Sequence, residues 1–396
     1  MKILHIGPVK NNNFLSNSMN DDEIANGIGP DGPSRSILGL IDGLTKLAVE
    51  VGLLSTKNFN YKSKSLPKKV TFLKPFTGKK YNIFTKPKHW IDQIETQFGT
   101  PDIVNFHDVY DLFSINLAKE IKKKGWKYFV TPRGGLREFA QKRDRPKKII
   151  ANKLFFNSYL ENAAFIHALT KEEANEISLF NPKLNKKIIA PNGVSNKVYN
   201  SIRNYKSDKK NRKIRIGFIG QLFTEIKGID LFLEAISIYQ NKMGDNLEFI
   251  FVGPIKSRFD QKVIDEKMKS IIFPDSVKFK GPLFGSDKWN ELSNFDVFAL
   301  TSRTEGMPVV VLEAMAFEKP CLVTKGTNMV DFIEEANAGW GTEASSKQIS
   351  DKLKIISNSK SENLIQLGQN SRKYFLNNFT WDIVSKQYLK QIEKFI

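Results

Sequence analysis

The sequence predicts a two-domain α/β protein in which each domain is built around a parallel β-sheet. The chain of 396 residues is longer than one hydrophobic core usually organises. Short apolar runs alternate with longer amphipathic segments along most of it, as in successive β-α-β units. The alternation stops in a polar, strongly charged segment, residues 203–213, and begins again directly after it.

The amino-terminal half contains candidate strands and two clear amphipathic helices. Helical spacing of apolar residues marks Ser34–Leu47 and Leu112–Lys124. The stretch Lys10–Gly32 holds several Gly and Pro residues and little apolar content, so we expect it to shape a binding edge. The expected strands are Lys2–Ile6, Val49–Leu54, Val70–Leu73, Ile103–Phe106, Tyr128–Thr131 and Phe165–Ala168.

The segment Ile214–Gly220 begins a second series of the same kind. Its helices include Ile229–Tyr239 and Val309–Phe317. We therefore expect one domain over residues 1–205 and another over residues 206–379. The further strands are Glu248–Val252, Val277–Lys280, Val297–Leu300 and Pro320–Val323.

Composition excludes several classes of protein. Apolar residues make up 40% of the chain and charged residues 26%, as in ordinary globular proteins. No stretch approaches the roughly 18 uncharged apolar residues of a membrane-spanning helix. The start, Met1–Pro8, is too short for a signal peptide and is expected to form the first buried strand. The single cysteine, Cys321, fits a reducing cytoplasm, and its apolar neighbours predict a buried structural thiol.

The formal charge of +19 is concentrated in one region. Lys119–Lys153 contains thirteen Lys and Arg residues against three acids, a net charge of +10. Such a density attracts phosphates, nucleic acid or anionic lipid. The sign of the charge does not choose among them.

The most specific motif is residues 302–316, Ser-Arg-Thr-Glu-Gly-Met-Pro-Val-Val-Val-Leu-Glu-Ala-Met-Ala. It follows an expected strand and opens an expected helix, whose N-terminus offers amide donors and positive dipole character. Gly306 permits close approach to the backbone. Glu305 lies before the helix and Glu313 about two turns into it, so the pair could span a sugar and a ribose. The alternative makes Glu305 a helix-terminal carboxylate and Glu313 a solvent-facing residue.

This motif resembles the E-x7-E signature of the retaining glycosyltransferases of family four, also called glycosyl transferases group 1. That family has the GT-B fold, two Rossmann-like domains facing each other across a cleft. The resemblance covers essentially the whole chain and is more specific in the carboxyl half. It implies that the last segment, residues 380–396, packs back on the first domain. Similar segments in the expected order are 131–136, 167–173, 191–194, 218–222 with 227–228, 251–253, 279–283 and 379–381.

The resemblance implies roles for individual residues. Glu313 would bind the ribose hydroxyls, Glu305 would lie beside the donor sugar, and Lys227 would neutralise the leaving diphosphate. The amides of Gly306 and Met307 would contact the sugar or its phosphate. The other implied donor-binding residues are Pro308, Leu283 near the nucleobase, Gln221, and Gly32 at the diphosphate from the opposite wall.

One residue departs from the family pattern. Where the family usually has an arginine that shares the diphosphate with the lysine, this chain has Gln221. One cationic contact is therefore lost or supplied from elsewhere. Arg303 and Arg35 are the nearest candidates in sequence to replace it.

Four histidines have different expected roles. His107 ends a strand at the edge where parallel sheets bind ligands, and in the family a histidine here commonly contacts the donor sugar. The alternative is a structural histidine, with Asp108 as a helix cap. His5 is expected to be structural, His167 to begin a capped helix, and His89 to lie on the surface.

No metal or cofactor is expected. The chain has no Asp-x-Asp pair for a divalent cation on a diphosphate, no His/Cys cluster and no Walker-type loop. Lys227 would supply the charge instead. In the mechanism that the resemblance implies, the acceptor hydroxyl attacks from the face that the nucleotide leaves, and configuration at the sugar is retained.

The basic region suggests where the acceptor lies. Its apolar companions Trp126, Phe139, Phe155 and Phe156 would enter a headgroup layer while lysines meet anionic lipid. We therefore expect peripheral attachment to the cytoplasmic membrane face and a lipid-linked or glycan acceptor, as in polysaccharide assembly. A solvated basic surface is the alternative. The acceptor-binding candidates Arg133 and Arg137 follow a strand end and would meet an acceptor phosphate.

Three other functions compete with this reading of the sequence. A basic nucleic-acid-binding protein is motivated by the pI of 9.6, but the chain has no helix-turn-helix, zinc finger or RNA-binding aromatic motif. A nicotinamide-dependent oxidoreductase would need a Gly-x-Gly-x-x-Gly loop in the right context. A sugar epimerase of the same fold stays open, because fold does not fix function.

Overall fold

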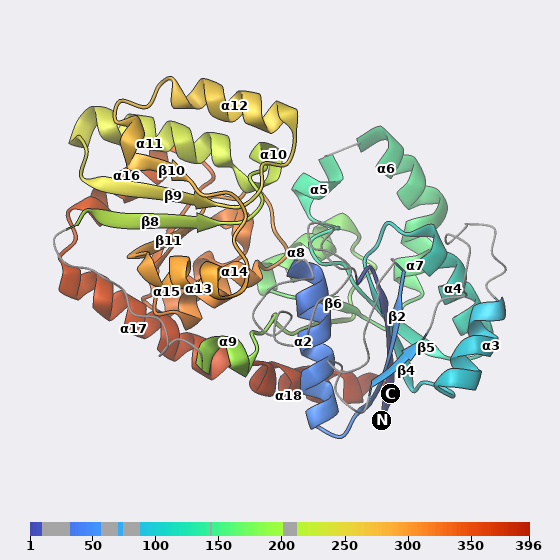
Figure 1. Cartoon of the computed structure of the whole chain (residues 1–396). Helices are drawn as coiled ribbons and strands as arrows, with labels where there is room; N and C mark the ends of the chain where they lie inside the picture. The colour runs from blue at the N-terminus through green and yellow to red at the C-terminus, as the bar shows by residue number, and fades with distance from the viewer. Residues whose placement is uncertain (10–31, 57–69, 74–87, 143–144, 201–211) are drawn as a thin grey trace. The chain divides into compact units, whose positions relative to one another are not determined.

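The computed structural model describes residues 1–9, 32–56, 70–73, 88–142, 145–200 and 212–396. They form two compact units. The first contains the described residues up to Gly193 together with Trp381–Ile396, and the second contains those from Val194 to Thr380. Each unit has its own sheet (Figure 1). The expected binding edge before Gly32 and the expected linker before Arg212 lie outside the described residues.

The sheet of the first unit has seven strands in the order β3-β2-β1-β4-β5-β6-β7, all paired in parallel. The central strands are buried on both faces, as in a sheet that helices cover on both sides, although one face carries the polar residues His5, Asn105 and His107. The strands are β1 Lys2–Gly7, β2 Glu50–Ser55, β3 Val70–Leu73, β4 Ile103–His107, β5 Lys127–Thr131, β6 Ile166–Ala168 and β7 Lys187–Ile189.

Helices cover both faces of this sheet (Figure 1). Helices α2 and α18 pack on one face, and α3, α4 and α7 pack on the other. The helices are α2 Gly32–Lys46, α3 Lys88–Gln97, α4 Leu112–Lys123, α5 Glu138–Lys142, α6 Arg145–Ala151, the π-helix η1 Asn152–Phe156, α7 Asn157–Glu161, α8 Lys171–Phe180, α18 Trp381–Ile392 and the 3-10 helix η5 Glu393–Phe395.

The last helix, α18, is held closely within the first unit. A Cβ at Gly39 of α2 would lie 2.1 Å from the indole nitrogen of Trp381, so the two helices approach each other only because residue 39 is glycine. The hydroxyl of Tyr388 accepts a hydrogen bond from the side-chain amide of Asn105 in β4, at 3.1 Å. The carboxyl-terminal helix therefore reaches the polar interior of the amino-terminal sheet.

The sheet of the second unit has six parallel strands in the order β10-β9-β8-β11-β12-β13. Both sheets are parallel and doubly covered, so the α/β fold class predicted from the sequence is confirmed. The strands are β8 Ile214–Ile219, β9 Leu247–Val252, β10 Val277–Phe279, β11 Val297–Leu300, β12 Cys321–Thr324 and β13 Gly339–Thr342. Cys321 is buried, as predicted, and burial raises the pKa of its thiol.

In Figure 1, α11, α12 and α16 lie on one face of the second sheet, and α13, α14 and α15 lie on the other. The helices are α9 Asn196–Asn200, α10 Thr224–Lys227, α11 Ile229–Met243, α12 Arg258–Met268, η3 Pro274–Ser276, α13 Gly285–Asn294, α14 Val309–Ala316, η4 Lys325–Thr327, α15 Val330–Glu335, α16 Ser346–Ser357 and α17 Ser361–Asn378.

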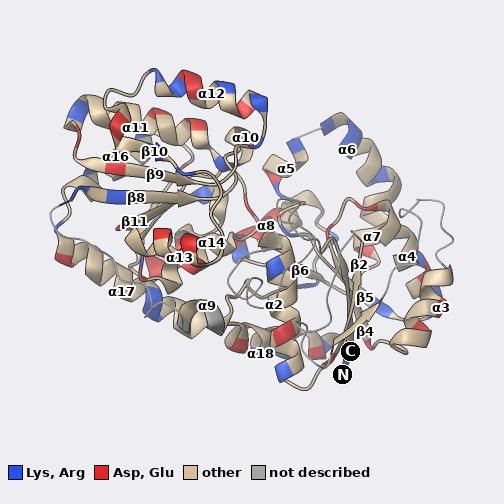
Figure 2. Cartoon of the chain, viewed as in Figure 1, with Lys and Arg blue, Asp and Glu red and all other residues tan. Residues whose placement is uncertain are grey.

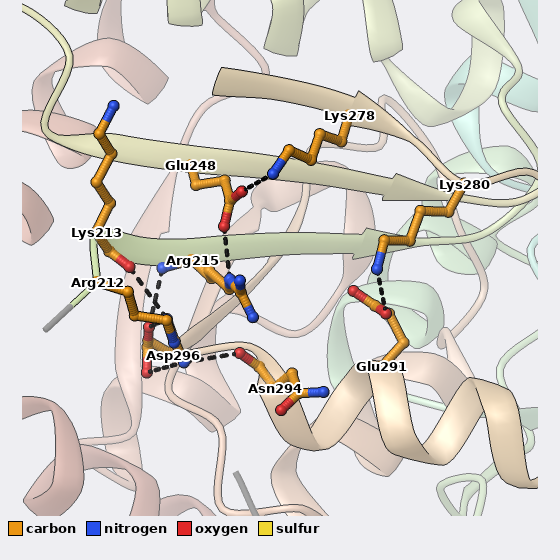
Figure 3. Close-up of polar contacts among 9 residues, drawn as sticks. All are labelled: Arg212, Lys213, Arg215, Glu248, Lys278, Lys280, Glu291, Asn294 and Asp296. Atoms are coloured by element: carbon orange, nitrogen blue, oxygen red, sulfur yellow. Dashed lines mark hydrogen bonds and ion pairs between the residues drawn. The ribbon is translucent and has the colours of Figure 1, made fainter. Parts of the chain in front are cut away.

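Charged side chains fix the end of this sheet at which β8 begins (Figure 3). Arg212 contacts the carboxylate of Asp296 at 2.6 Å, and the same carboxylate accepts a hydrogen bond from the backbone N–H of Arg215. Glu248 of β9 contacts Arg215 and Lys278 on its two sides. Arg212 and Arg215, at the start of β8, are therefore paired within this unit.

Several expectations from the sequence were incomplete or wrong. The short strands β7 and β13 were not predicted, because three residues after a lysine-rich turn and a segment with two glycines carry little strand signal. His167 lies within β6, whereas α8 begins at Lys171 with Thr170 as its cap. Asp111, not Asp108, caps α4.

Two of the aromatic residues expected at a membrane lie elsewhere. Phe156 is buried in the core of the first unit, and Trp126 packs against that core. They are therefore not available to a lipid headgroup layer.

Candidate functional site

The candidate site in the second unit is built by two loops, which follow β8 and β11. Gly228 has a φ of +64°, and a Cβ there would lie 2.3 Å from the carbonyl oxygen of Thr301. The Thr301 hydroxyl donates to the carbonyl of Gly228 at 3.2 Å, and the Arg303 N–H donates to the carbonyl of Ile226 at 2.7 Å. Only glycine permits this approach, which brings the segment containing Lys227 against the segment containing Glu305.

Lys227 and Glu305 form an ion pair across these loops. The ammonium contacts Oε1 of Glu305, which also accepts a hydrogen bond from the Ser302 hydroxyl at 2.9 Å. Both side chains are mostly buried, with 20% and 16% of their surface exposed. A lysine ammonium in this position is a compact cation whose present partner is a carboxylate, so a phosphate can replace that carboxylate.

Glu313 forms a second ion pair, deeper in the unit. Its Oε2 lies 2.6 Å from Nζ of Lys288 in α13, and both side chains are almost completely buried. The ammonium also lies 4.2 Å from the ring centre of Trp289. Because Glu313 is buried and paired, the alternative of a solvent-facing residue is wrong.

The turn between the two acids is held by the segment that follows β12. The side-chain amide of Asn328 donates to the carbonyl of Glu305 at 3.2 Å and to that of Gly306 at 2.9 Å. The Glu305 N–H donates to the carbonyl of Gly326 at 2.7 Å. Met307 and Pro308 are buried, so a ligand would meet Met307 through its backbone and not through its side chain.

The structure limits which cation can replace the arginine missing at Gln221. Gln221 is exposed after β8. Both terminal nitrogens of Arg303 contact the carboxylate of Asp230, at 2.8 and 2.6 Å, and one also donates to the carbonyl of Thr224. The charge of Arg303 is therefore already compensated. Leu283, expected near the nucleobase, is half-buried in the loop after β10.

A second group of predicted residues meets in the first unit. His107, at the end of β4, accepts hydrogen bonds through Nδ1 from two nitrogens of Arg133, at 3.1 and 3.3 Å. A third nitrogen of Arg133 donates to the hydroxyl of Ser36 in α2 at 2.9 Å. Ser36 in turn donates to Asn192.

These contacts define the protonation of His107. A guanidinium only donates, so Nδ1 of His107 carries no proton and the proton of the neutral ring is on Nε2. Nε2 lies 2.9 Å from Nδ1 of His5, which therefore accepts. The proton of His5 is then on its own Nε2, which has no hydrogen-bond partner among the described residues. Both nitrogens of His107 are engaged, so contact with a sugar would require Arg133 to move.

Burial keeps the three inner histidines neutral. Burial, followed by the charge of Arg133, lowers the pKa of His107 well below its ordinary value. Burial is also the main cause that lowers the pKa of His5 and of His167 to about 3. His167 contacts the hydroxyl of Thr131 at 3.1 Å and the carbonyl of Ala190 at 2.9 Å. His89 is exposed, as predicted.

The two acceptor-binding candidates have different surroundings. Arg137 is buried and forms an ion pair with Glu176, so its charge is compensated in this structure. Arg133 has a φ of +50° and contacts His107 and Ser36 instead. Gly32 is the first residue of α2, and a Cβ there would have no atom within 4 Å.

The residues that the structure describes contain no group of three or more His, Cys, Asp or Glu side chains that could hold a metal ion. Within the same residues, no helix has the length and apolar character that crossing a membrane requires.

Comparison with known proteins places these features in one family. Residues 202–374 match the family model described as Glycosyl transferases group 1, and this range contains Lys227, Glu305 and Glu313. The second unit therefore belongs to the glycosyl transferases group 1 family, as predicted from its motif.

Solved structures match the chain along its whole length. Sucrose-phosphate synthase from Thermosynechococcus elongatus has a TM-score of 0.72 at 16% identity, covering 100% of this chain and 99% of that one. The Anabaena protein HepE in complex with UDP has a TM-score of 0.67 at 16% identity, covering 100% of both. The chain has the GT-B fold that these structures share.

Similarity to curated relatives is shorter. CapM, a capsular polysaccharide biosynthesis glycosyltransferase of Staphylococcus aureus, is 26% identical over 184 residues, 46% of each chain. A diphospho-undecaprenol N-acetylgalactosaminyltransferase of Campylobacter jejuni is 32% identical over 112 residues, 28% of this chain and 29% of its own. The chain spans about half the length, or less, of the curated relatives it matches first.

Sequence reasoning missed residues that hold the site together. Lys288 and Asn328 lie outside the motif and have no spacing signal that links them to it. Asp230 follows Lys227-Gly228 closely, but its role in compensating Arg303 depends on the fold. The one hint in the sequence was a lysine next to a tryptophan, Lys288-Trp289.

Replacing Lys288 by Met should destabilise the second unit by about 3–5 kcal/mol, because it leaves a buried carboxylate without its cation. Adding Glu313→Gln removes that charge and should restore much of the loss. Urea unfolding of the single and double variants measures both changes. Lys325→Met, which breaks the exposed pair with Glu343, is the matched control and should not shift the transition. Additive losses in the double variant would contradict the pairing.

The neutral histidines predict acid sensitivity of the first unit alone. The folded pKa of His5 and of His167 is about 3, below the ordinary 6.5, so between these values the unfolded state binds more protons and stability falls as pH falls. Each should contribute roughly 2 kcal/mol of lost stability between pH 7 and pH 5.

Hydrogen exchange at β1 and β4, compared with β8 and β11, measures this difference. The second unit contains no histidine, so it provides the internal control. Equal acceleration of exchange in both units on acidification would show that the histidines are not the cause.

Proposed function

We propose that the protein is a retaining glycosyltransferase that moves a sugar from a nucleotide-sugar donor to an acceptor hydroxyl. The observation that carries the proposal is the paired arrangement of the two acids of the motif. Glu305 is held at a mostly buried lysine on the loops after two parallel strands, and Glu313 is held in the adjoining helix. Ligands of parallel α/β sheets bind at this edge.

Lys227 and Glu305 have defined tasks in this proposal. In the ligand-free pair, each neutralises the other. The donor diphosphate replaces Glu305 at the ammonium, which then stabilises the charge that builds up as the nucleotide leaves. Glu305, released from Lys227, then accepts hydrogen bonds from the donor sugar, and the backbone of Gly306 and Met307 lies next to it.

Glu313 binds the ribose hydroxyls of the donor. Lys288 keeps its carboxylate ionised and in place, because a buried carboxylate without a cation would tend to protonate. An ionised carboxylate accepts hydrogen bonds from two adjacent hydroxyls, and charge-assisted bonds of this kind are the stronger ones. Leu283 and Gln221 complete the proposed donor site at the base and the diphosphate.

The first unit supplies the remaining groups. His107 contacts the donor sugar once Arg133 turns toward an acceptor phosphate, and Gly32 approaches the diphosphate at the start of α2. Arg137 would assist with the acceptor. The acceptor hydroxyl attacks from the face that the leaving group vacates, and a phosphate oxygen takes its proton.

No metal takes part in this proposal, because Lys227 supplies the positive charge at the diphosphate. The acceptor is a glycan, most simply one linked to a lipid, in cell-surface polysaccharide assembly at the cytoplasmic face of the membrane. The functions of the relatives CapM and the Campylobacter transferase support this choice. A basic nucleic-acid-binding protein and a sugar epimerase are the alternative functions.

A thermal-shift screen with nucleotide sugars tests the donor site. One nucleotide sugar should raise the melting temperature, with or without a chelator, because a ligand that binds only the folded state stabilises it. Glu313→Gln and Lys227→Met should each reduce the shift measured from the variant's own melting temperature. Glu266→Ala on the exposed side of α12 is the matched control and should keep the full shift.

The same donor then distinguishes the alternatives. A glycosylated acceptor whose anomeric configuration matches the donor supports retaining transfer, whereas an isomerised nucleotide sugar formed without acceptor indicates an epimerase. No thermal shift with any nucleotide sugar, together with salt-sensitive binding to duplex nucleic acid, would overturn the proposal.

A further inference from the structure

Four large apolar side chains are exposed within one short stretch of the first unit. Ile149, Ile150, Leu154 and Phe155 have 57%, 61%, 61% and 45% of their surface exposed. Elsewhere in the described chain, exposed large apolar side chains are at least seven residues apart in sequence. Single exposed apolar residues are ordinary, but a contiguous group of them marks an interaction site.

Helix geometry gathers these residues on one side. Ile150 and Leu154 are four residues apart, as are Ile149 and Lys153, so each pair lies on neighbouring turns of the same face. Within η1 the N–H of Asn157 donates to the carbonyl of Asn152, a π-helical turn that inserts one residue. Phe156, the last residue of η1, and Tyr159 in α7 are buried in the core. The change from an outward to an inward apolar stretch therefore occurs within the π turn.

Basic residues surround this apolar group. Arg145, Lys147 and Lys153 are exposed, and the sequence has no acid between Arg145 and Phe156. Figure 2 shows basic positions along α6. Lys148 differs from them, because its ammonium contacts the carbonyl of Ala140 and lies 5.0 Å from the ring centre of Tyr110. Arg145, Lys147 and Lys153 therefore accompany the exposed apolar side chains, whereas Lys148 makes contacts within the first unit.

We propose that this surface, the α6–η1 face, docks the protein on an anionic lipid bilayer. Ile149, Ile150, Leu154 and Phe155 enter the boundary between headgroups and acyl chains, and Arg145, Lys147 and Lys153 meet lipid phosphates. Duplex nucleic acid offers phosphates but no apolar phase, so it matches the charges and leaves the four apolar side chains in water. This inference rests on the proposed function, because docking on the bilayer would bring the protein to a lipid-linked acceptor.

Vesicle flotation of the full chain tests the apolar part of the face. The protein should float with phosphatidylcholine–phosphatidylglycerol vesicles and much less with phosphatidylcholine alone. The double variant Ile150→Gln/Leu154→Gln should lower the partition coefficient at least about tenfold. Leu179→Gln/Phe259→Gln removes two equally exposed apolar side chains from α8 and α12 and should leave binding unchanged.

A charge-matched pair tests the basic part. Lys147→Gln/Lys153→Gln should weaken binding to the anionic vesicles and reduce its salt dependence. Lys262→Gln/Lys269→Gln removes the same charge from exposed positions of the second unit and should have little effect. Equal losses in the two pairs would indicate attraction by net charge alone and would overturn the α6–η1 face.

Tryptophan fluorescence measures whether the α6–η1 face enters the bilayer. Leu154→Trp should show a blue-shifted tryptophan emission on adding anionic vesicles, and Leu179→Trp should not. Binding to duplex DNA with no flotation would overturn the proposal in favour of a nucleic-acid surface. Loss of self-association in Ile150→Gln/Leu154→Gln, again with no flotation, would instead assign the face to a contact between copies.

The donor thermal shift separates this proposal from the proposed function. A variant that no longer floats but keeps its shift with the nucleotide sugar supports both. A wild-type protein that shows the thermal shift but never floats overturns only the membrane surface. Flotation without any thermal shift overturns only the transferase.

Discussion

The contact between Gly228 and the carbonyl of Thr301 is the constraint on which the candidate site depends. Parallel strands end at one edge of a sheet, but their loops usually diverge. Here a left-handed glycine lets the loop after β8 pack directly on the loop after β11. Lys227 comes immediately before that glycine and therefore faces Glu305. A side chain at position 228 would separate Lys227 from Glu305, two mostly buried and opposite charges that pair directly.

The two ion pairs of the site differ in burial, and this difference gives them different roles. The Lys227–Glu305 pair retains some exposure, so an incoming anion can exchange with the carboxylate. The Lys288–Glu313 pair is almost completely buried, so it is a fixed part of the unit. Buried pairs seldom add net stability over apolar residues of the same size. The Lys288–Glu313 pair is better explained by ligand binding, because it holds an ionised carboxylate in a fixed position where it can accept hydrogen bonds.

The sequence predicted the fold class and the motif, because the signals for both lie within short continuous segments. Strand and helix periods located β1, β4, β8, β11 and α14 to within a residue or two. It did not predict the partners that set each group's chemistry. Lys288 meets Glu313 only through the packing of α13 on α14, and Arg133 reaches His107 only because β4 and β5 are neighbours. Of the exposed group at Ile149–Phe155, only Phe155 was named from the sequence, since a π turn that rotates a helix face leaves no periodic signal.

The central claim, that Glu313 binds the ribose hydroxyls, is tested most directly by calorimetry on the wild type and on Glu313→Gln. For each protein, the affinity of a nucleoside diphosphate is compared with the affinity of its 2′,3′-dideoxy analogue. The base is the one that the donor screen selects. If Glu313 binds the ribose hydroxyls, removing them should weaken binding to the wild type by about tenfold or more and change binding to the variant far less. The same ratio of affinities in both proteins would show that Glu313 does not contact the ribose, and would contradict the account.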